Sequence, residues 1–166
     1  MPSLKALLSG LVTMGLLLTS SLAAAVPEIQ HWRTANGVPV YFIPARELPM
    51  VDAQILFSAG SARDGERPGL AQFTNALLEE GAGDWSADVI ADRFDQVGAR
   101  FSASSRRDSA SVALRSLVEA RYLQPAVETV ARLLKEPTFA PDAVERVRQQ
   151  MLTLLRERAQ SPGAIA

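Results

Sequence analysis

Three runs of strand-type residues lie between positions 29 and 58. Residues 29–34 and 38–44 flank Ala35-Asn36-Gly37. Asn-Gly between two β-prone runs is the strongest short hairpin signal, because both residues tolerate positive φ. Residues 51–58 (VDAQILFS) predict a third strand that ends at the turn-prone stretch 59–62. This part of the chain therefore predicts a hairpin followed by a single strand.

Apolar positions then change to helical spacing. Residues 68–80 predict one helix, and residues 86–97 predict a second helix that Ser86 caps and Gly98 ends. The buried stripe expected for the first of these helices consists of Leu70, Phe73 and Leu77.

A second hairpin and two further helices complete the pattern. Residues 99–105 and 109–117 flank a charged turn and contain many Ser and Ala, which allow close approach by a helix. Helices are predicted at 121–135 and 141–158, and the stripe of the last one consists of Val144, Val147, Met151, Leu154 and Leu155. This order predicts an α+β fold, a mainly antiparallel sheet with helices packed on one face.

The N-terminal segment differs from the rest and predicts a signal peptide over residues 1–25. Lys5 precedes the uncharged, largely apolar run 6–22, and Ala23-Ala24-Ala25 supplies small residues for cleavage. We therefore expect export to the periplasm, a single domain over residues 26–166, and no stable membrane span after cleavage. A retained membrane anchor is the alternative interpretation.

Composition narrows the chemistry further. The chain has no cysteine, which excludes a disulfide framework, thiol catalysis and lipoprotein attachment. Its formal net charge is −1 at pH 7 with both signs scattered along the chain, so nothing indicates a nucleic-acid partner.

Several polar residues have both a functional and a plainer interpretation. His31 is the only histidine and would need converging donors to build a metal site, so we interpret it as an ordinary strand residue. Asp92 and Asp95 have the spacing of a carboxylate pair but fit a solvated helix face better. Arg106-Arg107 could dock an acidic partner or lipid headgroup, but beside Asp108 they are typical of a charged turn.

Two further pairs have the same two interpretations. Glu79 and Glu80 end the first helix and could line a cleft, although solvated charges are the plainer interpretation. Their position at a helix C-terminus is mildly unfavourable to the helix dipole. Trp32 and Trp85 could provide peptide contact surface or cover the core.

The segment Gly69-Leu70-Ala71-Gln72-Phe73-Thr74-Asn75-Ala76 resembles the zinc helix of the insulinase-like metallopeptidases, the family of pitrilysin and the mitochondrial processing peptidases. That helix opens G-L-A/S-H-F-L-E-H in the family and follows a Gly-Ser-rich turn, as it follows residues 57–62 here. Residues 98–103 (GARFSA) resemble the family segment that enters its hairpin, and residues 144–158 resemble the helix that carries a Glu zinc ligand. The resemblance covers residues 29–166.

The resemblance also implies that the zinc site is degenerate. The motif H-x-x-E-H places two His ligands and a catalytic Glu on one helix face. The corresponding positions here are Gln72, Asn75 and Ala76, and the third ligand, expected 77 residues after the second His, corresponds to Thr153. Neutral amides, a methyl group and an alcohol would hold Zn²⁺ weakly, so we expect no metal, no cofactor and no catalytic residue in this chain.

Members of the family often work as pairs in which one subunit or half has lost its zinc. The resemblance therefore implies a non-catalytic partner of a zinc-bearing sibling, closing a chamber and helping to hold a peptide substrate. Family subunits contain two similar domains, and we expect this chain to be a piece ending within or near the first, with an exposed sheet edge and low solubility. An active zinc metalloendopeptidase and a stand-alone exported peptide-binding or scaffold domain are the alternatives.

Overall fold

The computed structural model describes residues 28–160, and the described chain divides into two compact units between Leu48 and Pro49. Each unit is described separately. The predicted signal peptide, residues 1–25, lies outside the described residues.

The described part of the first unit is the predicted hairpin. Strands β1 (Gln30–Arg33) and β2 (Pro39–Phe42) pair antiparallel, with His31 opposite Tyr41. The Gly37 N–H donates to the Thr34 carbonyl at 2.9 Å, and Gly37 has a φ of +85°. The left-handed conformation at this glycine is the reason the Asn-Gly signal predicted the turn correctly.

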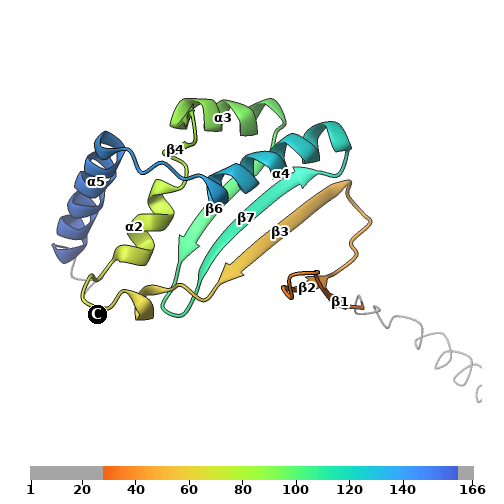
Figure 1. Cartoon of the computed structure of the whole chain (residues 1–166), viewed down its shortest axis with the longest axis horizontal. Helices are drawn as coiled ribbons and strands as arrows, with labels where there is room; N and C mark the ends of the chain where they lie inside the picture. Colours follow the sequence, from red (N-terminus) through yellow and green to blue (C-terminus); the bar gives the residue numbers. More distant parts are fainter. Residues whose placement is uncertain (1–27, 161–166) are drawn as a thin grey trace, which may run out of the picture. The chain divides into compact units, whose positions relative to one another are not determined.

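The second unit is built on a three-stranded antiparallel sheet with the order β3-β7-β6 (Figure 1). These strands span Met50–Phe57 (β3), Arg100–Ser105 (β6) and Ala110–Leu117 (β7). The central strand β7 pairs over its whole length with β3, so residues far apart in sequence share one ladder.

Helices cover one face of this sheet, which confirms the predicted α+β architecture. Helix α2 (Leu70–Leu77) packs on β6, α3 (Ala87–Gln96) on α4 and β6, and α4 (Ala120–Lys135) on β7. Helix α5 (Pro141–Ala159) lies against α2, beyond the sheet (Figure 1). All four predicted helices are present, and α2 is shorter than the predicted range 68–80.

The core lies between the sheet and these helices. Ile90, Leu133 and Val112 are at most 2 % exposed and come from α3, α4 and β7. Ala126 on α4 is fully buried, which allows α4 to approach β7 closely, and the Phe94 and Phe101 rings stack with centroids 5.5 Å apart. Ala110 and Ser116 of the 99–117 hairpin are also buried, so small residues of this hairpin contribute to the helix packing that the sequence predicted.

The predicted stripes of α2 and α5 are wrong in part. Leu70 is 43 % exposed, whereas Leu77 is buried, and on α5 only Ala143 and Val147 are buried. Leu154 and Leu155 are more than half exposed. The physical reason is that α2 is the main element packed against α5, so one helix covers less of α5 than its apolar pattern would allow.

A short element between α2 and α3 was not predicted. Gly81–Ala82 (β4) and Trp85–Ser86 (β5) form a two-residue ladder around a tight turn, and Ala82 bridges Pro137 after α4. The predicted cap is confirmed, because the Ser86 hydroxyl oxygen accepts from the Val89 N–H at 3.4 Å. Strands of two residues leave no alternating pattern for sequence reasoning to detect.

Candidate functional site

The start of α2 is fixed by a carboxylate from the preceding turn. The Asp64 Oδ2 accepts from the Gly69 N–H at 2.8 Å, and its Oδ1 accepts from the Ala71 N–H at 2.9 Å. Gly69 has a φ of +93°, which turns the chain into the helix. A negative group satisfying free N–H groups at a helix start is favourable on both hydrogen-bonding and dipole grounds. Sequence reasoning missed Asp64, although an Asp shortly before a Pro-Gly helix start was the available signal.

The turn before Asp64 is held by the tip of the second hairpin. The Ser61 and Ala62 N–H groups donate to the carbonyls of Arg106 and Arg107 at 2.9 and 2.8 Å. Gly60 lies so close to these carbonyls that an added Cβ would meet main-chain atoms at 2.4 Å. The Arg106-Arg107 turn therefore positions the chain leading into α2 through its backbone.

The four degenerate zinc positions lie on α2 and α5, which pack together. Gln72, Ala76 and Thr153 are exposed, and Asn75 is half-buried. The Asn75 Nδ2 donates to the Ala71 carbonyl at 2.8 Å, and the Thr153 hydroxyl donates to the Gln149 carbonyl at 3.0 Å. Each of these two side chains thus bonds the backbone of its own helix, four residues back.

This set of groups is poor at metal chemistry. It offers neutral amides, an alcohol and a methyl group, whereas Zn²⁺ is held in proteins by imidazole, thiolate and carboxylate. Within residues 28–160, no three His, Cys, Asp or Glu side chains converge in a way that could hold a metal ion. The absence of a catalytic residue at these four positions stays a prediction, which the zinc content of the purified chain tests.

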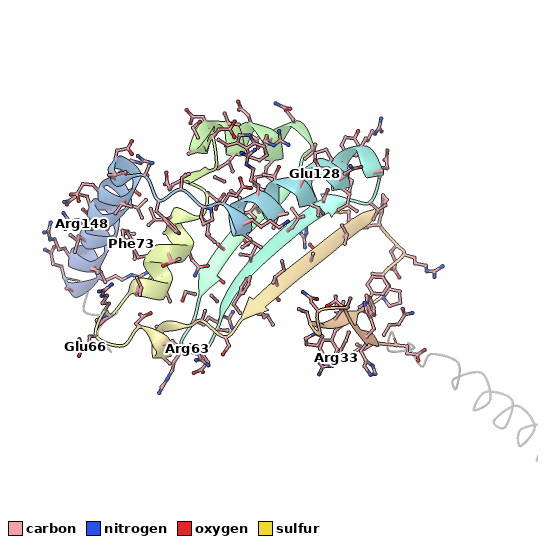
Figure 2. All side chains as sticks on the ribbon, in the orientation of Figure 1. Arg33, Arg63, Glu66, Phe73, Glu128 and Arg148 are labelled. Atoms are coloured by element: carbon pink, nitrogen blue, oxygen red, sulfur yellow. The ribbon has the colours of Figure 1, made fainter. Side chains whose placement is uncertain are left out.

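The end of α2 is tied to α5 by charge. Arg146 on α5 forms an ion pair with Glu80, whose side chain is only 20 % exposed. Glu79 is exposed as a residue, but partial burial of its carboxyl raises the pKa of this group, and the charge of Glu80 raises it further. Glu80 is therefore a partly buried, paired carboxylate and not the solvated charge of the plainer interpretation. Arg148 lies on the outer side of α5 and pairs with Glu145 (Figure 2).

A hollow of about 380 Å³ lies beside α2. Asn75 and Thr74 line it from the helix, and the rest of its wall is mainly apolar, with Phe57, Leu78 and Val112 contributing. Its chemistry suits an apolar side chain better than an ion.

The other singled-out residues have structural surroundings. His31 stacks on Tyr41 within the hairpin, with ring centroids 6.4 Å apart. Asp92 and Asp95 are exposed on α3, as the plainer interpretation expected. In the part of the chain that the structure describes, no helix combines the length and apolar character needed to cross a membrane.

Trp85 lies between two arginines. The guanidinium carbons of Arg93 and Arg132 lie 4.0 and 4.1 Å from the centre of its ring, one from α3 and one from α4. Arg132 also pairs with Asp84, and the Arg93 Nε donates to the buried Thr129 hydroxyl at 3.2 Å. Trp85 packs against the core, in agreement with its structural interpretation.

Comparison with known proteins places this chain in a family. The sequence profile of the insulinase family, peptidase family M16, matches residues 45–163. A curated relative, the non-peptidase homolog YmxG of Helicobacter pylori, is 29 % identical over 149 residues, which cover 89 % of this chain and 34 % of the relative. The chain thus spans about a third of the length of that relative.

Solved structures agree with this placement. The peptidase M16 inactive domain of Pseudomonas fluorescens is 40 % identical, with a TM-score of 0.80 over 84 % of this chain and 34 % of that one. A protease of Helicobacter pylori (19 % identity, TM-score 0.73, 84 % and 34 % of the two chains) and pitrilysin (23 %, 0.66, 82 % and 15 %) share the fold. With the family profile matching most of its length, the chain belongs to the insulinase family of peptidases, family M16.

Proposed function

We propose that this chain is a non-catalytic subunit, or part of one, that pairs with a zinc-bearing insulinase-like sibling in the periplasm. It contributes to the wall of a peptide-holding chamber and performs no bond cleavage itself. The observation that carries the proposal is the combination of a retained family fold with four metal and catalytic positions occupied by Gln72, Asn75, Ala76 and Thr153.

The relatives support the non-catalytic part of this proposal. The curated relative is described as a non-peptidase homolog, and the structure that is 40 % identical is described as an inactive domain. The role in a pair rests on the family analogy. An inactive subunit that keeps its fold can still contribute by shaping the site of a catalytic partner. Export rests on the charge and apolar pattern of residues 1–25.

Co-purification tests the pairing. The full-length protein, tagged at its C-terminus and isolated from the periplasm, should recover a relative that carries the intact H-x-x-E-H motif. Peptide cleavage should require both subunits and should be absent for either alone. A periplasmic fraction that contains this chain but never yields such a relative would contradict the proposal and favour a stand-alone binding domain.

A further inference from the structure

The open face of the sheet, opposite the helices, carries a row of three charged side chains. The strand register sets Asp52 of β3 opposite Arg115 of β7, and Arg115 opposite Arg100 of β6. The β7 residues on either side of Arg115, Leu114 and Ser116, are buried against the helices. Because successive side chains alternate between faces, the three charged residues project from the uncovered face.

The charges of this row do not cancel. The Arg115 Nε donates to the Asp52 Oδ1 at 2.6 Å, and its Nη2 donates to the Asp52 Oδ2 at 3.0 Å, a two-pronged pair. This pair lowers the pKa of Asp52, which keeps the carboxylate ionised at neutral pH. Arg100 forms no ion pair with any residue between 28 and 160.

Two arginines directly opposite each other are an unfavourable choice for sheet stability. Like charges at opposed positions of neighbouring strands repel, and one carboxylate compensates only one of the two. The row also lines a hollow of about 640 Å³, to which Gln54 and Ser102 add uncharged hydrogen-bonding groups. A surplus positive charge among polar neutral groups in a hollow is suited to a singly charged anion.

We infer that Arg100, beside the Asp52-paired Arg115, binds the carboxylate of an Asp or Glu side chain in a peptide lying on the open face. The inference rests on the proposed function, since it names the kind of peptide that this subunit would hold. A guanidinium matches a carboxylate in planar shape and hydrogen-bond spacing. The net charge of the row, one positive unit, balances one carboxylate and leaves a dianionic phosphate half neutralised.

Fluorescence anisotropy with the full-length protein tests this inference. The probes are two fluorescent peptides whose N-terminus is blocked by the label or by an acetyl group and whose C-terminus is amidated. They are identical except for Glu or Gln at one central position. The Glu peptide should bind about threefold to fivefold more tightly at low salt, with the difference shrinking as salt is added. Arg100→Gln should reduce binding of the Glu peptide to the level of the Gln peptide and leave the Gln peptide unchanged.

Two controls distinguish a specific effect of Arg100 on binding from an effect of overall charge and from an effect of the substitution on folding. Arg107→Gln, at the exposed turn where the residue acts through its carbonyl, removes the same charge and should leave the preference for Glu intact. Arg100→Gln should melt no lower than the unmodified protein, because it removes a repulsive pair.

Three results would overturn the inference. Equal binding of both peptides by the unmodified protein would leave peptide holding in place and refute the role of Arg100. If Arg100 mattered only for the binding of a peptide that has no acidic side chain but has a free C-terminal carboxylate, the assignment of the ligand as an Asp or Glu side chain would be refuted. Binding of neither peptide, by the chain alone or with its partner, would remove the peptide-holding function and this site together.

Discussion

Single residues decide whether this helix can hold a metal. Of the four degenerate positions, only Asn75 and Thr153 have hydrogen-bonded side chains. Each of these side chains bonds the backbone of its own helix. Ala76 has no donor atom, so the position of the second His ligand can contribute nothing. The family resemblance identified Gln72, Asn75 and Ala76 because their motif lies within one helix, and it assigned Thr153 by the family spacing of 77 residues.

Glu79 gives a pH-dependent prediction at the residue scale. Its folded-state pKa is raised by burial and by Glu80, so ionisation opposes folding. By linkage, this penalty is absent at pH values below the ordinary glutamate pKa of 4.5 and develops as the pH rises through the raised pKa of Glu79. Glu79→Gln should therefore raise the melting temperature at pH 7 and have no effect near pH 3.5, measured by circular dichroism.

The control for this prediction is Glu66→Gln, which changes an exposed turn carboxylate (Figure 2). A melting temperature that rises equally for both variants, or that rises for Glu79→Gln at acidic pH as well, would refute burial as the cause.

Gly60 gives a second prediction at this scale. A methyl group there would lie 2.4 Å from the Arg107 carbonyl oxygen and the Ser109 nitrogen, which are main-chain atoms that cannot rotate away. Gly60→Ala should lower the free energy of unfolding by about 1–3 kcal/mol in urea denaturation. Gly65→Ala meets no atom within 4 Å but has a φ of +57°, so it should show backbone strain alone, about 1 kcal/mol. Equal costs would show that the collision at Gly60 is relieved.

At the scale of elements, local signals predicted the fold well and tertiary contacts supplied the rest. The Asn-Gly hairpin, the Ser86 cap and all four helices follow from patterns within one element. The strands of the β4–β5 ladder are too short to leave an alternating pattern, and Asp64 lies outside the helix that it caps. The exposed half of α5 depends on how little packs against it. A periodic pattern shows which face is apolar but not how much of that face is covered.

Asp64 gives a prediction for α2. Removing its carboxylate frees the N–H groups of Gly69 and Ala71 at the helix start. Asp64→Ala should cost about 1–2 kcal/mol of unfolding free energy and increase amide exchange in the first turn of α2. Asp108→Ala, at the exposed tip of the second hairpin, is the matched control and should change neither quantity. Unchanged exchange in Asp64→Ala would contradict the capping role.

Trp85 gives a prediction for the junction of α3 and α4. Trp85→Leu keeps an apolar side chain but removes the ring faces on which Arg93 and Arg132 lie, and should cost about 1–3 kcal/mol. In a double-mutant cycle, Arg93→Gln should cost less in the Trp85→Leu background than in the unmodified protein. Strict additivity of the two changes would show that the arginine and the ring do not interact.

At the scale of the whole molecule, the chain keeps the family fold, and the zinc and catalytic positions that the resemblance assigns are occupied by Gln72, Asn75, Ala76 and Thr153. The chain covers about a third of the length of its curated relative, so its full assembly and activity belong to the proposals above. The proposed pairing depends on the prediction that α2 carries no catalytic group.

The zinc content of the purified full-length chain, measured by elemental analysis after exchange into metal-free buffer, tests this interpretation most directly. A matched variant restores the donors together, with Gln72→His, Asn75→Glu, Ala76→His and Thr153→Glu. The unmodified chain should hold far less than one zinc per molecule and cleave no peptide. The restored variant should hold more zinc than the unmodified chain. One tightly held zinc per unmodified chain, together with peptide cleavage by that chain alone, would contradict the account.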